Sequence, residues 1–260
     1  MGIHRQLATG LAAAVLSAAA GHAAAATATA AISTIHFTVV DLDPNDGIAA
    51  GITFTNFGGA GIDTQTKGIN GPNPDWMWRL TSMGSGLGPV TSQTGSSFAS
   101  GTLFAGDVLG SGVAASTSAQ AWGDSNSARG SVQIFNVNFV LAPHTQLLLL
   151  ADASVASGGA AGESARADVG ISLQTADFSI YRSAQQVAWL NSLGVTQIDG
   201  TSQLLVSLSN ESAQDQLMGT AYAYSFSLVQ GVATAVPEPA SAGLLLAGLV
   251  GLGTLRRHRR

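Results

Sequence analysis

Four oxygen-bearing side chains lie close together near the start of the chain, at Asp41, Asp43, Asn45 and Asp46. The first three occupy alternate positions, and the group ends just before Gly47. Carboxylate and amide oxygens with this spacing suit a hard cation such as calcium. The segment is therefore a candidate calcium site whose remaining ligands would come from elsewhere in the fold.

An EF-hand is excluded at this position. Such a loop needs glycine at its sixth position and a bidentate glutamate at its twelfth. Counted from Asp41, glycine comes one place late at Gly47, Pro44 interrupts the segment, and the twelfth residue is Ile52. The alternative to a metal site is an Asx-turn loop, in which the same side chains accept hydrogen bonds from nearby backbone amides. Calcium is the one cofactor candidate.

Aromatic side chains could form flat surfaces for sugar rings at Trp76, Trp78, Trp122, Tyr222 and Tyr224. Aromatic residues more often fill the core of a β-sandwich, so we expect most of these side chains to be buried. Trp76 and Trp78 follow a segment rich in proline and asparagine, which makes them the best candidates for an exposed glycan platform.

The sequence offers little for catalysis. Residues 123–125 read Gly-Asp-Ser, which resembles the nucleophile block of one hydrolase family and would make Ser125 the nucleophile. Such a serine needs a histidine as base, usually oriented by an aspartate. Between the two ends of the chain only His36 and His144 remain, and neither lies in the D-x-x-H arrangement of that family. Zinc is also disfavoured because the chain lacks cysteine. We expect no catalytic residues.

Charge excludes nucleic acid as a partner. Residues 27–235 contain 14 acidic and 5 basic side chains, an excess of 9 negative charges. Nucleic-acid binding depends on cationic side chains at the phosphates. The absence of cysteine also means that no disulfide stabilises the body, so stability must come from burial and from sheet hydrogen bonds.

Alternating apolar residues predict an all-β body that places these side chains. Short strands are expected at 34–40, 48–57, 76–80, 111–122, 131–141, 145–156, 165–173, 177–182, 204–208 and 220–229. Residues 58–74 are expected to form a long loop, 82–101 give only weak signals, and 183–193 form the one plausible short helix. The predicted fold is an antiparallel β-sandwich or jelly roll, with small alanines that allow the sheets to approach closely.

The start of the chain has the pattern of a secretory signal peptide. A short basic region is followed by an apolar stretch from Leu7 to Ala20 and then by small residues. Cleavage motifs of the A-x-A type occur at 24–26 and again at 28–30. We expect residues 1–26 to be a removable leader and residues 27–235 to be the extracytoplasmic domain.

The end of the chain predicts one short transmembrane helix. Residues 240–255 carry no charge, and as a helix they would reach roughly 24 Å, against a hydrocarbon core near 30 Å. A basic tail follows directly and should stay in the cytoplasm by the positive-inside rule. Its arginines are Arg256, Arg257, Arg259 and Arg260.

Pro237-Glu238-Pro239, the apolar segment and the arginine tail together resemble the PEP-CTERM sorting signal of Gram-negative bacteria. The resemblance covers residues 236–260 and implies recognition by a membrane-embedded exosortase, cleavage near the motif and transfer to the cell surface. In that family the signal tends to accompany exopolysaccharide production. Pro237, Glu238 and Pro239 would be the residues that the processing enzyme reads.

We therefore expect a non-catalytic protein that is exported through the inner membrane and transiently anchored there. It would then be released to the cell surface or the extracellular matrix. Its expected role is structural, in the envelope or the exopolysaccharide, with an exosortase and possible extracellular polysaccharide as partners. The alternatives are a carbohydrate- or calcium-binding module of the adhesin type and, less favoured, a secreted hydrolase.

Overall fold

The computed structural model describes residues 25–68, 75–81, 87–104, 113–123, 126–159, 162–191, 196–197 and 199–231. Ala25–Val232 form one compact unit. Throughout the described residues the regular structure consists of β-strands paired antiparallel, which confirms the predicted all-β class. Within the same residues no helix is long and apolar enough to span a membrane. The predicted leader up to residue 24 and the predicted membrane segment lie outside the described part.

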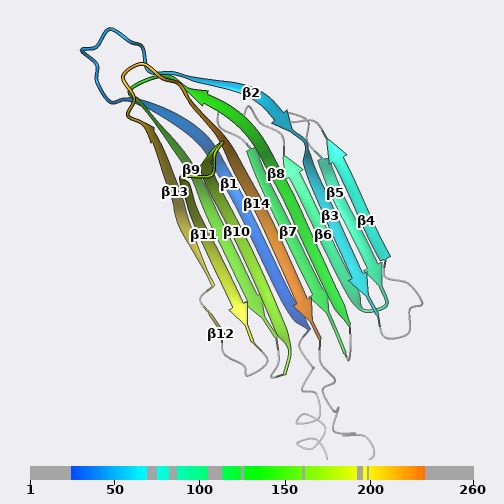
Figure 1. Cartoon of the computed structure of the whole chain (residues 1–260). Helices are drawn as coiled ribbons and strands as arrows, with labels where there is room; N and C mark the ends of the chain where they lie inside the picture. The colour runs from blue at the N-terminus through cyan, green and yellow to red at the C-terminus, as the bar shows by residue number, and fades with distance from the viewer. Residues whose placement is uncertain are drawn as a thin grey trace, which may run out of the picture. The chain divides into compact units, whose positions relative to one another are not determined.

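Two sheets make up this unit (Figure 1). The first, sheet A, has the order β13 (Gly200–Asn210), β9 (Thr145–Gly158), β1 (Ala26–Asp41), β7 (Val113–Ala121), β6 (Ser97–Phe104) and β5 (Leu87–Thr94). The second, sheet B, has the order β12 (Thr196–Gln197), β11 (Tyr181–Leu190), β10 (Ser164–Thr175), β14 (Leu217–Gln230), β8 (Ser127–Leu141), β3 (Ala60–Lys67) and β4 (Asp75–Thr81). The remaining strand, β2 (Ile52–Gly58), also pairs with β8.

The sheets face each other across one shared apolar core, an arrangement compatible with the predicted sandwich. Along β9 the alternate residues Leu147, Leu149 and Ala151 are buried, as their spacing predicts. The two largest fully buried side chains, Phe135 and Phe139, lie in the half of β8 that leads into the β8–β9 turn. We call the side of each sheet that points away from this core its outer face.

Small residues bring the two sheets close together in the other half of the core. Ala28 and Ala30 of β1 are buried, and the Ser225 hydroxyl of β14 donates across the core to the carbonyl of Ala30 at 3.1 Å. The same hydroxyl lies 3.1 Å from Thr117 Oγ1 of β7. A Cβ added to Gly130 would stand only 2.8 Å from the carbonyl oxygen of Ser100 in the facing sheet. The predicted close approach of the sheets is thus present.

Several stretches differ from the predicted elements. The predicted strand at 177–182 is mostly a turn, because β11 begins only at Tyr181. Residues 58–74 contain β3 rather than only a loop, and 82–101 contain β5 and most of β6. The core-facing positions of these strands are largely Thr, Ser, Ala and Gly, so an apolar alternation is hard to see in the sequence. The predicted helix at 183–193 is wrong, because β11 pairs with β10 from Tyr181 to Leu190 and buries Ala188 and Leu190.

The orientation of β14 also departs from expectation. Its core-facing residues are small, such as Ala221, Ala223 and Ser225, whereas Tyr222 and Tyr224 point to the outer face of sheet B. Since the two sheets approach closely at this strand, the core has room for methyl and hydroxyl groups but none for aromatic rings. The bulky residues of β14 therefore line the surface.

Candidate functional site

Three connections meet at one end of the two sheets: the β1–β2 loop, the β8–β9 turn and the β13–β14 loop (Figure 1). The backbone amide of Leu42 donates to the carbonyl of His144 at 2.7 Å, and the amide of His144 donates to the carbonyl of Ser212 at 3.2 Å. The amide of Ala142 donates to Gly51 at 3.0 Å. These bonds hold the aspartate-rich segment against the β8–β9 turn, and we call this region the loop end.

The aspartate-rich segment is folded as a series of Asx turns. One oxygen of Asp41 accepts from the amide of Asp43 at 3.0 Å, and one oxygen of Asp43 accepts from the amide of Asn45 at 3.3 Å. One oxygen of Asp46 accepts from the amide of Ile48 at 2.6 Å. Each carboxylate thus stabilises the local backbone through one oxygen and keeps its second oxygen for other partners.

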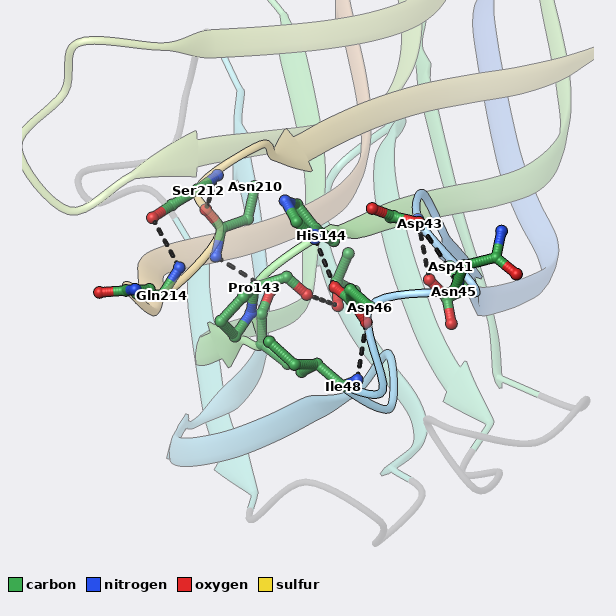
Figure 2. A network of polar contacts seen from close by, with 12 residues as sticks. Asp41, Asp43, Asn45, Asp46, Ile48, Pro143, His144, Asn210, Ser212 and Gln214 are labelled. Atoms are coloured by element: carbon green, nitrogen blue, oxygen red, sulfur yellow. Dashed lines mark hydrogen bonds and ion pairs between the residues drawn. The ribbon is translucent and has the colours of Figure 1, made fainter.

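The second oxygen of Asp46 forms a hydrogen bond with Nδ1 of His144 (Figure 2). The Ile48 amide and, next, the His144 imidazole hold the pKa of the Asp46 carboxyl below its usual value. Ligand atoms of Asp43, Asp46 and His144 all lie within 4.8 Å of one another. The structure therefore adds an imidazole to Asp43 and Asp46, two of the four predicted residues, and the carboxylate of Asp41 is not part of this group.

A donor set of one imidazole and two carboxylates differs from an all-oxygen calcium site. Nitrogen ligands suit zinc and other transition metals, whereas calcium takes six to eight oxygens. Sequence reasoning could not place His144 here, because it lies 98 residues from Asp46. The pairing of β1 with β9, which ends with Asp41 opposite Thr145, brings the two segments together.

Asn210 fixes the neighbouring loop (Figure 2). Its buried side-chain nitrogen has two hydrogens to donate and lies within hydrogen-bond distance of three carbonyl oxygens, those of Leu141 at 3.3 Å, Ala142 at 2.9 Å and Asp215 at 2.8 Å. Its side-chain oxygen accepts from the Ser212 amide at 3.2 Å. The β8–β9 turn and the β13–β14 loop are thereby joined through one residue that the sequence did not mark as important.

The candidate glycan platform lies on a different part of the molecule. The backbone of Trp76 pairs with Gln65, and Trp78 pairs with Asp63, so both residues belong to β4 at an edge of sheet B. The Trp78 side chain is 57% exposed on the outer face. Trp122 is also exposed. The expectation that aromatic residues fill the core is therefore wrong for Trp78 and Trp122, and also for the outward-facing tyrosines of β14.

The residues considered for hydrolysis lie far apart. Gly123 and Asn126, which flank Ser125, come between β7 and β8, whereas His144 follows the other end of β8. At about 3.3 Å per residue, the 15 residues of β8 separate these ends by roughly 45 Å or somewhat less. His36 lies within β1, opposite Leu150. The described residues therefore place neither histidine beside the Gly123–Asn126 turn.

The described residues thus form an all-β body of two sheets, with a cluster of polar side chains at its loop end. Residues 235–260 match the family model described as the PEP-CTERM protein-sorting motif. The chain thus carries a sorting signal read by exosortases, and it is an exported protein whose sorting passes through the membrane. Pro237, Glu238, Pro239 and the arginine tail fall within that match and lie outside the described residues.

Comparisons with whole proteins add little. No curated protein matches the chain. One solved structure is described as "Structural basis for the promiscuous specificity of the carbohydrate-binding modules from the beta-sandwich super family". The alignment covers 77% of this chain and 97% of that chain, with 11% identity and a TM-score of 0.10. With so low a score, the likeness carries no weight for the fold or for function.

Proposed function

We propose that the protein is a non-catalytic component of the cell surface or of the extracellular polysaccharide matrix. The observation that carries this proposal is the sorting motif at residues 235–260, joined to an all-β body. A processing enzyme of the exosortase type would cut near Pro237–Pro239 and release the body from its membrane segment. We also propose that the released body ends in the extracellular matrix or on the envelope surface.

The geometry of the described body supports a role without catalysis. Its two histidines are held away from the Gly123–Asn126 turn by the length of the strands, and His144 is paired with Asp46. A nucleophilic serine needs a base within about 3 Å. The excess of acidic over basic side chains in residues 27–235 favours partners other than nucleic acid and polyanions.

The test follows the protein in the producing bacterium. Wild-type chain is compared with a variant in which Pro237, Glu238 and Pro239 are replaced by alanine. Wild type should be recovered, shortened at its C-terminal end, from the cell surface or the extracellular polysaccharide fraction, whereas the variant should stay uncut in the membrane fraction. Intact-mass measurement and fractionation read out both points. Equal release of the two chains would contradict sorting through this motif, and a shortened wild type absent from both fractions would contradict the proposed location.

A second candidate role is cation binding at the loop end. The convergence of Asp43, Asp46 and His144 favours it, because these residues offer ligand atoms within 4.8 Å of one another. Calcium is the cation that the sequence suggests, and zinc is the one that the imidazole suits. A bound cation should raise the melting temperature with concentration, and His144→Ala should remove the effect. No shift with either ion would reject this role.

A further inference from the structure

The outer face of sheet B carries a row of mostly large, apolar or aromatic side chains along its central strand β14. Because alternate residues of a strand point to the same side, one row runs the length of this strand. Its members are Met218, Thr220, Tyr222, Tyr224, Phe226 and Leu228. We call this row the β14 track. From its first to its last residue it extends about 33 Å, at about 3.3 Å per residue.

Tyr224 is held in a fixed position at the middle of the track. Its ring lies over Gly170 of β10, where an added Cβ would stand 2.5 Å from the ring. Its hydroxyl donates to one oxygen of Asp168 at 3.1 Å, and Arg166 donates to the other oxygen at 2.6 Å. Asp168 is only 3% exposed although it lies on the outer face. Burial and, next, the Asp168 charge raise the pKa of Tyr224, so the hydroxyl stays neutral.

Tyr222 lies beside this fixed ring. The two tyrosine rings are 5.8 Å apart between centroids and tilted by 32°. Further along, the guanidinium of Arg129 lies 5.4 Å from the ring centroid of Phe226. Trp189 on β11 pairs with Arg166 and is 47% exposed, which widens the aromatic surface toward that end. The track is therefore a preorganised series of rings.

A pocket of about 260 Å³ opens at the loop-end terminus of the track. Phe178 and Met218 supply exposed apolar groups there, and Phe178 is 73% exposed. Polar groups line the remainder: the Thr220 hydroxyl donates to the side-chain oxygen of Asn138 at 3.0 Å, and Gln174 lies opposite Thr220 on the neighbouring strand. The pocket thus combines apolar surface with amides and hydroxyls.

The strands on either side of β14 present uncharged hydrogen-bonding groups. Opposite the track stand Ser131, Gln133, Asn136, Asn138, Ser172 and Gln174. The charged side chains directly beside the track are paired with one another: Arg166 with Asp168 at 2.6 Å, and Arg129 with Asp63 at 3.9 Å. The surface beside the track therefore offers rings, amides and hydroxyls, and its two arginines already have carboxylate partners.

We infer that the β14 track binds a linear, uncharged polysaccharide chain. Each sugar ring has an apolar C–H side, which fits the face of an aromatic ring, and a rim of hydroxyls, which fits amides and hydroxyls. A track of about 33 Å takes several consecutive sugar units, so the ligand is the middle of a chain. This inference rests on the proposed function, because export to a polysaccharide-containing environment brings the ligand within reach.

Other occupants fit this face less well. A protein partner or a second copy of the chain would need a largely apolar, contiguous contact area. Here polar residues interrupt the apolar surface beside β14: Ser131, Gln133, Asn136 and Asn138 on β8, and Asp168, Ser172 and Gln174 on β10. An acidic polysaccharide would meet a body with an excess of 9 negative charges. A neutral polysaccharide is compatible with both observations.

The test is affinity electrophoresis of the processed protein, purified from the producing bacterium. Gels contain the uncharged fraction of that bacterium's own extracellular polysaccharide, or alginate as a polyanion. The uncharged polymer should retard the protein, and alginate should not. Tyr222→Ala and Phe178→Asn should each weaken binding by about tenfold, the loss expected for a central aromatic contact. The matched control is Phe104→Ala, which removes a 61% exposed ring from the outer face of sheet A and should leave binding unchanged.

The outcomes separate this inference from the proposed function. Polysaccharide binding at the β14 track would be contradicted if the gel did not retard the protein. It would also be contradicted if Tyr222→Ala, with an unchanged melting temperature, were retarded as much as wild type. Preference for alginate would contradict it as well. Sedimentation showing dimers that Tyr222→Ala dissociates would assign the face to a second copy instead. If the protein is sorted to the matrix but the polysaccharide gel does not retard it, the proposed function stands and only polysaccharide binding at the β14 track is rejected.

Discussion

Phe178 is a large residue in a backbone conformation that favours glycine. It lies in the turn between β10 and β11 with φ at 60°, and its amide donates to the carbonyl of Thr175 at 3.0 Å. A side chain in the left-handed region costs about 1 kcal/mol relative to glycine. The exposed ring at this position lines the pocket beside β14, and ligand binding there would explain why a large residue occupies this turn.

The strain at Phe178 can be measured with two substitutions. Phe178→Gly should be more stable than Phe178→Ala by about 1 kcal/mol in the free energy of unfolding, because both remove the ring and only glycine relaxes the backbone. Denaturant unfolding monitored by tryptophan fluorescence gives the difference. Equal stability of the two variants would show that the turn tolerates a Cβ without strain.

Asp177, next to Phe178, should make the turn sensitive to acid. Hydrogen bonds from Thr175 and Ser179 lower the pKa of its carboxyl to about 2, below the value of 3.8 expected for a free aspartate. Its contribution to stability is therefore complete above about pH 4 and is lost as the pH falls from about 4 to about 2. Asp177→Asn keeps an acceptor for Ser179 and should flatten the fall in melting temperature over that range. An unchanged pH profile would contradict the assignment.

At the scale of single elements, the sequence predicts strands well where buried positions are aliphatic. β8 and β9 carry Val, Phe and Leu at alternate core positions, and both are recognisable from the pattern. β3 buries Thr64 and Thr66, whose hydroxyls pair with Ser92 and Thr94 across the core at 2.8 and 2.9 Å. A strand that buries paired hydroxyls has no apolar alternation, so the sequence suggests a loop.

The faces of β14 show a second limit of sequence reasoning. Alternation correctly places Tyr222, Tyr224 and Phe226 on one side of the strand, but burial statistics assign that side to the core. Which side of β14 is buried depends on the distance between the sheets. That distance is short here because Ala30, Thr117 and other residues of sheet A facing β14 are small. At the loop end the aspartates were visible in the sequence, whereas His144 required the pairing of β1 with β9.

Asn210 should be the most sensitive polar residue of the loop end. Asn210→Ala leaves three carbonyls and one amide without this partner, and it should lower the free energy of unfolding by about 2–3 kcal/mol. Asn210→Asp has the same shape but sets a carboxylate against those carbonyls, so it should be at least as damaging at neutral pH. Gln214→Ala in the same loop, where only the backbone amide is bonded, is the matched control and should change stability by less than about 0.5 kcal/mol. A mild effect of both Asn210 variants would mean that the two connections hold each other without it.

At the scale of the whole molecule, the fold constrains where the predicted leader can be cut. β1 begins at Ala26 and is the third strand of sheet A, paired with β7 on one side and β9 on the other. Ala28 and Ala30 are buried in the core. A cut after the motif at 28–30 would therefore remove the first five residues of β1 and leave backbone groups on both neighbouring strands unpaired.

We accordingly expect cleavage at or before Ala26, for example at the A-x-A motif of residues 24–26. Each unpaired buried backbone group costs about 1–3 kcal/mol, so losing several of them should exceed the stability margin of an ordinary domain. Intact-mass measurement of the secreted protein locates the cut directly. Two chains that start at Thr27 and at Ala31 behind the same foreign leader give the control: the first should be secreted folded, and the second should aggregate or be degraded. A stable mature protein beginning at Ala31 would mean that the alanine end of β1 is dispensable, and that β7 and β9 can close sheet A without it.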